Sequence, residues 1–408
     1  MNGSVSMAYS VARIVYGFTP MVGGSITHVI ELSNQMDKVL SNQVIIAPDW
    51  PGGTTSDKKS GLKVVRIPIL LNGLVNLLTN DILAQIIYAK DVVDKIIELN
   101  AQGIHFDILH AHGPLIGSFI KYFTKKKLNI PVIVMNHGGY GTNDSPNLLT
   151  SGRFSKSLIR IVMKQLPADN YLALDDGTGV QKMRRDIIEC HRGCTIVNHG
   201  IDTELFAPGS DSKALSNGSR LRILFPHRIY QFKRPDIALD ILYDLVFRYK
   251  IVDVEMIFLS DSKEEMMLSD MARAKDIADF VSFEPKKQPV EMVGMYNSCD
   301  VIIGTSIISN INRATLEAMS CGRAVVIFDS GDLKGLVDNT NGFVVKSGDL
   351  NGFTDAIYEL YLNPDLRARI GAEARKTIIQ NRSWKNRIKV ELETYESVLS
   401  NFKSNSMA

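Results

Sequence analysis

The stretch from residue 301 to residue 329 constrains the fold most, because its hydrophobic pattern changes from strand to helix and back within one short segment. Residues 301–303 are an apolar run that ends at a glycine, which predicts a buried parallel strand. A polar loop follows, and residues 312–320 have helical spacing before a second glycine at the position where helices commonly end. Residues 324–328 then predict another buried strand. In open parallel sheets ligands bind beyond the carboxyl ends of the strands, so we expect the loop to face a ligand.

The start of the predicted helix favours an anionic ligand. The first backbone amides of a helix have no partner within it, and they bind phosphate groups well. Asn312, Ala314 and Thr315 lie in the loop and the first turn, and Glu317 follows about one turn inside the helix. There a carboxylate is placed to reach a hydroxyl beside the phosphate. The segment therefore predicts a site for a ligand with a phosphate and a neighbouring hydroxyl.

Two segments of this half resemble the donor-binding half of the family 4 retaining glycosyltransferases: LEAMSCGRAVV at 316–326 and NGFVVKSGD at 341–349. The resemblance extends over nearly the whole chain. It implies an α/β protein of the GT-B fold, in which two Rossmann-like parallel-sheet domains face each other across a cleft. It also implies that the substrate is a nucleotide-sugar.

The resemblance assigns Glu317 to the ribose hydroxyls of the nucleotide, but the sequence departs from the family where the sugar is bound. The family has a second glutamate eight positions earlier, and this chain has Ser309 there. Two family glycines are replaced by Asn310 and Asn312. Neutral side chains at these positions offer weaker hydrogen bonds than a carboxylate, so we expect an unusual or modified donor sugar.

The length of 408 residues predicts two domains. We expect an N-terminal, acceptor-side domain over residues 1–208, a serine-rich linker over 209–220 and a nucleotide-sugar-binding domain over 221–384. Residues 385–408 are expected to return to the first domain as a helix over 385–399, with a disordered end.

Bulk properties exclude several classes of protein. The composition is 45% hydrophobic and 22% charged, and the net charge of +2 does not favour nucleic acid as a partner. No apolar run approaches the ~20 residues of a membrane span, and the first ten residues do not read as a secretory signal. Four cysteines are too few for a disulfide framework, and Cys190 and Cys194 lack a second metal half-site. We therefore predict a cytoplasmic protein.

Peripheral membrane contact stays open as an alternative. The predicted helix over residues 118–127 ends in three lysines at 125–127. Lysines at a helix C-terminus complement the helix dipole, and the simple interpretation is a solvated helix end. Basic patches of this kind also attract anionic lipid, which would place the protein at the inner face of a membrane.

A Gly-Gly pair ends the first predicted strand. Gly23 and Gly24 lie at a strand-to-helix turn, where the absence of side chains lets a ligand approach the backbone. A plain tight turn is the alternative. The segment lacks the G-x-G-x-x-G spacing of a dinucleotide site, which argues against a dehydrogenase. It is similar to the family's first loop, which implies a contact with the donor phosphate.

Histidines follow two later strands of the same half. An apolar strand ends in His110 and His112, which share one side of the strand because Ala111 separates them. Imidazole suits a group that contacts a sugar hydroxyl near neutral pH. The family pattern implies that His112 is an active-site residue, and we expect His110 to tie loops together. His137 follows the next strand, where the family lines the acceptor side; a glycine-rich loop without ligand contact is the alternative.

Two cations follow the first strand of the second half. Arg228 and Lys233 lie in a strand-to-helix loop at a spacing that suits a diphosphate, with arginine as a planar fork and lysine as a point charge. A surface basic cluster is the default alternative. The family has both cations at this spacing, which implies that both bind the donor diphosphate.

Together these features predict transfer of a glycosyl group from a nucleoside diphosphate sugar to an acceptor hydroxyl, with retention at the anomeric carbon, in glycan or glycoconjugate biosynthesis. No Asp-x-Asp pair stands at a strand end, so we expect no metal, and we expect no cofactor. The leaving phosphate is expected to take the acceptor proton. A catalytically silent subunit that stabilises a partner glycosyltransferase is the main rival, followed by a GT-B epimerase or phosphorylase. The acceptor (a saccharide, a lipid-linked glycan or a small molecule) and self-association stay open.

Overall fold

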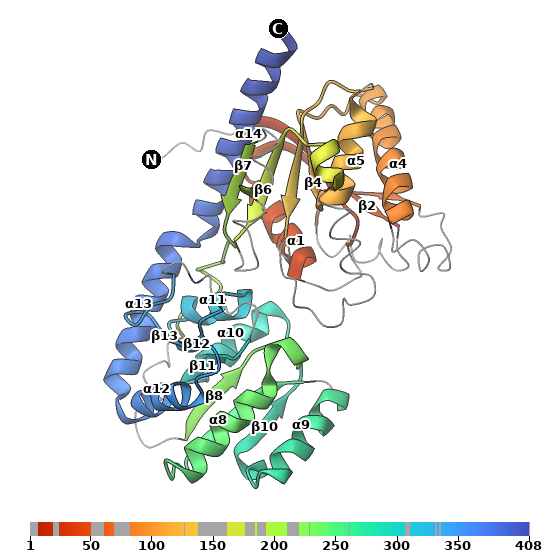
Figure 1. Ribbon diagram of the computed structural model, residues 1–408. Helices are drawn as coiled ribbons and strands as arrows, with labels where there is room; N and C mark the ends of the chain where they lie inside the picture. Colours follow the sequence, from red (N-terminus) through yellow and green to blue (C-terminus); the bar gives the residue numbers. More distant parts are fainter. Residues whose placement is uncertain are drawn as a thin grey trace. The chain divides into compact units, whose positions relative to one another are not determined.

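The computed structural model describes most of the chain, and it divides into two compact units (Figure 1). The first unit consists of Met1–His199 and Arg387–Ala408, and the second of Gly200–Asn386. The described residues are 7–18, 24–49, 61–68, 82–125, 127–137, 161–175, 184–185, 193–209, 220–227, 229–260, 262–306, 311–330, 333 and 336–407.

The first unit is built on a parallel sheet of seven strands in the order β3-β2-β1-β4-β5-β6-β7. Most strands are continuous apolar runs, because helices cover a parallel sheet on both faces. The order reverses between β1 and β4, where such sheets bind ligands at their carboxyl edge. The strands are β1 (Met7–Val15), β2 (Leu40–Pro48), β3 (Val64–Ile67), β4 (Ile108–His112), β5 (Val132–Asn136), β6 (Asn170–Leu174) and β7 (Gly193–Val197).

The helices of the first unit supply apolar faces to this sheet. One of them, α4 (Ile82–Ala101), contributes four fully buried residues to the core that also contains Leu109: Ala89, Val92, Val93 and Ile96. The helices are α1 (Gly24–Met36), α4 (Ile82–Ala101), α5 (Pro114–Thr124) and most of α14 (Trp384–Met407).

The second unit has a parallel sheet of six strands in the order β10-β9-β8-β11-β12-β13, so its order reverses between β8 and β11. Its strands are β8 (Leu221–Phe225), β9 (Val254–Leu259), β10 (Val281–Glu284), β11 (Val301–Gly304), β12 (Ala324–Phe328) and β13 (Phe343–Val345). Its helices are η3 (Gln231–Lys233), α8 (Pro235–Phe247), α9 (Ser262–Ala274), η4 (Ala278–Phe280), α10 (Pro289–Asn297), α11 (Arg313–Ser320), α12 (Leu350–Leu362) and α13 (Pro364–Asn381). The strand–loop–helix–strand unit expected around α11 is confirmed.

Residues 200–208 lie in the second unit, although the sequence assigns them to the first domain. Phe206 is 1% exposed and its ring packs edge-on against Tyr296 of α10. Its carbonyl accepts hydrogen bonds from Ser320 Oγ at 2.7 Å and from Arg375 Nη1 at 3.1 Å. These partners are far away in sequence, which is why sequence alone places the boundary too late.

The C-terminal helix is longer than predicted. α14 continues to Met407, whereas we expected it to end at residue 399 and the chain end to be disordered. Tyr395 and Val398 are buried, and Lys121 of α5 lies over the ring of Phe402 at 5.3 Å. The spacing of these three positions on α14 is helical, so packing on the first unit extends the helix.

Residues 350–381 form two helices rather than one. α12 ends at Leu362 and α13 begins at Pro364, because proline is favoured at the first position of a helix and cannot continue the preceding one. Among the helices of the described part, none is long and apolar enough to cross a membrane.

Candidate active site

His112 occupies the point where the strand order of the first sheet reverses. It is the last residue of β4, and the register places it beside Val15, the last residue of β1. Its side chain is 8% exposed. The sheet topology thus brings an imidazole to the edge at which ligands bind in this class of sheet.

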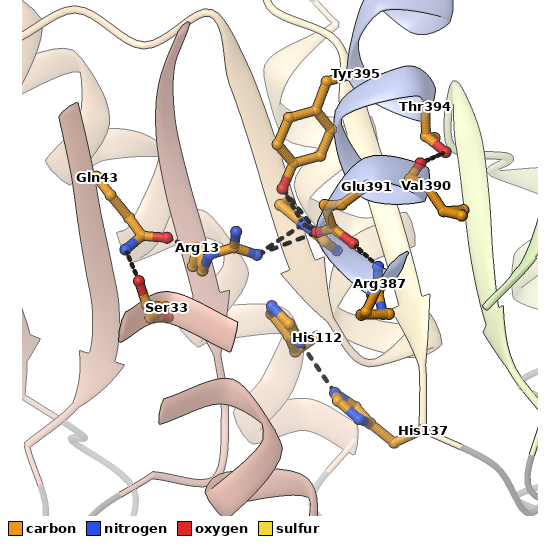
Figure 2. A network of polar contacts seen from close by, with 11 residues as sticks. Arg13, Ser33, Gln43, His112, His137, Arg387, Val390, Glu391, Thr394 and Tyr395 are labelled. Carbon is orange, nitrogen blue, oxygen red and sulfur yellow. Dashed lines mark hydrogen bonds and ion pairs between the residues drawn. The ribbon is translucent and has the colours of Figure 1, made fainter. Parts of the chain in front are cut away.

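His137, one residue beyond the end of β5, pairs with His112. The two rings stack with centroids 5.2 Å apart and an interplanar angle of 22°, and His112 Nδ1 lies 3.0 Å from His137 Nε2 (Figure 2). One of these nitrogens donates and the other accepts. The outer nitrogens, His112 Nε2 and His137 Nδ1, are buried without a hydrogen-bond partner in the described part of the chain. The pair therefore offers one donor and one acceptor, which matches a sugar hydroxyl.

Both imidazoles of the pair are neutral at pH 7. Burial lowers the pKa of His137 to about 4; the neighbouring His110 and Arg387 act in the same direction, and Glu391 opposes them. Burial likewise holds the pKa of His112 well below its usual value, reinforced by His110, His137 and Arg13. Neutral rings keep a lone pair available, so the pair can accept as well as donate hydrogen bonds.

His28 joins this group and was not predicted as a functional residue. It lies on α1, is 1% exposed, and its ring meets His137 edge-on at 5.4 Å and His199 at 5.8 Å. The sequence signal was its place one turn after Gly24, at the start of the helix that follows the Gly-Gly turn. Its partners lie far along the chain, so the grouping became visible only in the folded unit.

In the second unit, the loop that carries Lys233 is fixed to the carboxyl end of β11. Thr305 Oγ1 donates to the carbonyls of Lys233 and Arg234 at 2.8 and 2.9 Å, and Ser306 Oγ donates to that of Phe232 at 3.2 Å. Arg234 takes a left-handed conformation with φ of 52°, which turns the chain into α8. The predicted cation therefore stands on a loop held at the strand-order reversal of the second sheet.

His227, just after β8, stiffens the base of the same loop. Burial lowers its pKa to about 3, the nearby Lys233 acts in the same direction, and a hydrogen bond with the backbone of Ile303 opposes both. A neutral histidine here links β8 to β11. The sequence analysis did not assign it a role.

The start of α11 has a cap that the sequence analysis did not include. Asn312 is the N-cap residue, and its side chain accepts a hydrogen bond from the backbone amide of Thr315 at 3.3 Å. Asparagine is among the strongest N-cap residues, so Asn312 stabilises the start of the helix. Thr315 is buried and Ala314 is partly exposed in the first turn.

Glu317 is buried at 6% exposure, and its carboxylate already has two partners. Arg313 Nε donates to Oε1 at 2.6 Å, and the Tyr296 hydroxyl donates to Oε2 at 2.9 Å. Burial and the carboxylate together hold the pKa of Tyr296 well above its usual value. Each carboxylate oxygen can accept a further hydrogen bond, so the group is pre-oriented rather than blocked.

Four predicted site residues, Gly23, Arg228, Ser309 and Asn310, lie outside the described residues. Gly24 is the first residue of α1. Within the described residues, no group of three His, Cys, Asp or Glu side chains is arranged to hold a metal ion.

Two family models match the chain and together span both units. Residues 22–205 match the model described as Glycosyltransferase Family 4, and residues 209–377 match Glycosyl transferases group 1. Two curated relatives are D-inositol 3-phosphate glycosyltransferases. The relative from Corynebacterium jeikeium is 26% identical over 290 residues, which is 67% of this chain and 68% of the relative. The relative from Saccharomonospora viridis is 24% identical over 317 residues, covering 74% and 73%.

Solved structures share the fold. Anabaena Alr3699/HepE in complex with UDP has a TM-score of 0.70 at 14% identity, covering 96% of this chain and 100% of that one. A glycosyltransferase from Rickettsia africae has a TM-score of 0.72 at 17% identity, covering 97% and 99%. Two Rossmann-like units define the GT-B class of glycosyltransferase fold. With the two family matches, this chain belongs to the family 4 glycosyltransferases.

Proposed function

We propose that this protein is a retaining glycosyltransferase that moves a sugar from a nucleoside diphosphate sugar to an acceptor hydroxyl without a metal ion. Family membership supports the transferase class. Structures with the same fold include proteins solved with UDP, with UDP-glucose and with ADP, which supports a nucleotide-sugar as the donor.

The observation that carries the proposal is the Lys233 loop, which Thr305 and Ser306 fix at the strand-order reversal of the second sheet. When the glycosyl bond breaks, negative charge develops on the diphosphate oxygens. A cation held in place stabilises that charge without reorganising during the reaction. Arg228 and the amide of Ala314 are the further donors that we assign to the diphosphate, together with the Gly23–Gly24 turn.

Glu317 is assigned to the ribose. Its carboxylate is oriented by Arg313 and Tyr296, and a carboxylate accepts hydrogen bonds from ribose hydroxyls. Asn312 shapes the helix start by capping Thr315. Ser309 and Asn310 take the place of the family residues that read the sugar, so we propose a donor sugar that does not require a carboxylate.

In the first unit, His112 and His137 are assigned to the sugar and acceptor hydroxyls. A neutral imidazole pair provides one donor and one acceptor, whereas no carboxylate stands at position 309 to form a covalent intermediate. We therefore propose attack from the face that the diphosphate leaves, with a phosphate oxygen taking the acceptor proton. Retention of the anomeric configuration follows from this course.

The experiment is a donor screen with the purified chain. Release of nucleoside diphosphate is measured from UDP-, GDP- and ADP-sugars, with inositol 3-phosphate among the acceptors because curated relatives carry that name. Turnover with at least one donor, and product of retained configuration by NMR, supports the proposal. Nucleotide binding without turnover by any donor would favour a silent partner-binding subunit. No affinity for any nucleoside diphosphate would refute the donor site.

A further inference from the structure

A buried carboxylate on the C-terminal helix lies at the centre of a polar network in the first unit (Figure 2). Glu391 of α14 is fully buried, and its Oε1 has three neighbours. The Tyr395 hydroxyl donates to it at 2.8 Å, His110 Nδ1 lies 3.1 Å away and Arg13 Nη1 lies 3.4 Å away. Glu391 is not among the predicted site residues and takes no part in the transfer proposed above.

The charges of the network fix the ionisation of Glu391. Arg387 Nη1 lies 2.5 Å from Oε2, so two guanidinium groups face one carboxylate. Burial alone would raise the pKa of Glu391, but Arg387, His110 and Arg13 hold it well below its usual value. An ionised carboxylate only accepts hydrogen bonds, and Glu391 Oε1 accepts them from the Tyr395 hydroxyl and from Arg13 Nη1.

This ionisation determines the tautomer of His110. Burial lowers the pKa of His110, so its ring is neutral and carries one N–H. His110 Nδ1 lies within reach of Glu391, of the Tyr395 hydroxyl at 2.8 Å and of Arg13 at 3.1 Å. Because the Tyr395 hydroxyl donates to Glu391, its oxygen can accept from an Nδ1–H that also faces the carboxylate. The opposite tautomer would let Nδ1 accept from Arg13, but it would bury an Nε2–H that has no acceptor among the described residues. His110 Nε2, buried without a hydrogen-bond partner among the described residues, carries the lone pair in the Nδ1–H form.

The ring of His110 stacks on His112 and so restricts the orientation of the active-site histidines. His110 and His112 project from the same side of β4, and their rings lie 4.6 Å apart at an interplanar angle of 16°. His112 in turn stacks on His137. Neighbouring rings in this stack of three are therefore nearly parallel. Among the described residues, the ring at one end, His110, is the one that contacts charged groups of β1 and α14.

We propose that Glu391, with Tyr395, is a positioning residue for the transfer reaction: it holds His110 as the Nδ1–H tautomer, and the His110 ring fixes the plane of His112. The proposal rests on the proposed function of His112. It gives the C-terminal helix a role in the reaction, because the helix supplies the carboxylate that orients the histidine stack.

Three variants on α14 test the proposal. Glu391→Gln keeps the shape but removes the charge. Tyr395→Phe removes the hydroxyl that donates to the carboxylate and leaves both arginines paired with it. Thr394→Val is the matched control, because it also deletes a buried hydroxyl of α14, one that bonds only the carbonyl of Val390 within the helix at 2.8 Å (Figure 2).

The first readout is the tautomer of His110, measured by NMR on protein labelled with ¹⁵N-histidine. We expect the Nδ1–H form in the unmodified chain and in Thr394→Val, and loss of the single form in Glu391→Gln. The second readout is kinetic. We expect kcat to fall about tenfold in Glu391→Gln, as for other groups that orient a reacting histidine, with the donor KM unchanged. For Tyr395→Phe we expect kcat to fall about threefold. This corresponds to half of the change in activation free energy that a tenfold loss represents.

An Nε2–H tautomer of His110 in the unmodified chain would overturn the proposal, as would a kcat for Tyr395→Phe equal to that of Thr394→Val. If Glu391→Gln does not fold, Tyr395→Phe still tests the proposal, because it removes no charge from the buried network. Failure of the proposed function is distinguishable from failure of this inference. An unmodified chain that turns over no donor refutes the transfer reaction, whereas the tautomer of His110 can be measured without turnover.

Discussion

The two candidate half-sites occupy the same place in their sheets but rely on opposite electrostatics. Each lies where the strand order reverses, between β1 and β4 in the first unit and between β8 and β11 in the second. The first presents neutral imidazoles, whose pKa values burial lowers. The second presents Lys233 and the ion pair of Arg313 with Glu317. A shared topology therefore determines where chemistry is placed, and the side chains determine whether it is charge stabilisation or hydrogen bonding.

The largest expected effect belongs to the cations of the second unit. Lys233→Met should lower kcat/KM by about 10²–10³-fold, because it removes a fixed charge at the leaving diphosphate, and Arg228→Ala should abolish transfer while the fold stays intact. Steady-state kinetics and calorimetry with nucleoside diphosphate measure both. Lys275→Met is the control, since Lys275 pairs with Asp240 on the surface. Near-normal activity in either variant would contradict the phosphate assignment.

A substitution in the histidine group of the first unit should lower kcat and leave the nucleotide affinity unchanged. His112→Ala is expected to lower kcat by about 10²-fold, because the sugar hydroxyl loses an oriented partner, and to leave the affinity for nucleoside diphosphate unchanged. Comparison of kcat with the calorimetric Kd distinguishes an effect on turnover from an effect on nucleotide binding. His105→Ala, at an exposed histidine after α4, is the control. An equal loss of nucleotide affinity would remove the distinction between the units.

Glu317→Gln should act mainly on donor affinity. The amide is a weaker acceptor for ribose hydroxyls than the carboxylate, so we expect the Kd for nucleoside diphosphate to rise about tenfold. The matched control is Glu373→Gln, at an exposed carboxylate paired with Lys376 on α13. Circular dichroism confirms the fold of each variant, since Glu317 also pairs with Arg313. An unchanged Kd would exclude Glu317 from the nucleotide site.

The smallest expected effect is a difference in acid stability between the units. Histidines with lowered pKa values take up protons on unfolding, so the stability that they contribute is complete above about pH 6.5 and declines as the pH falls toward the folded-state pKa. In the first unit His28, His110, His112 and His137 have such values, with His137 at about 4. In the second unit His227 has one, at about 3.

Hydrogen exchange measured by mass spectrometry at pH 7 and pH 5 tests this difference. Amides of β4 and β5 should lose more protection than those of β8 and β11 when the pH is lowered. Equal losses in both sheets would show that the histidine group does not govern acid stability.

Much of the fold was readable from hydrophobic periodicity. The strand β12 has the predicted bounds, and α11 begins within one residue of its predicted start, because continuous apolar runs and helical spacing report burial directly. The family motifs predicted the placement of Lys233 and Glu317 on the second unit. Periodicity failed at the chain end, where α14 runs to Met407, since its burial depends on α5.

The sequence by itself determined the elements, the two sheets and the local motifs, because these depend on residues that are neighbours along the chain. Only the tertiary structure decided which histidines meet and that Glu391 reaches His110. His110 and Glu391 are separated by most of the chain, and a hydrogen bond between them depends on a distance of about three ångströms that no local pattern encodes.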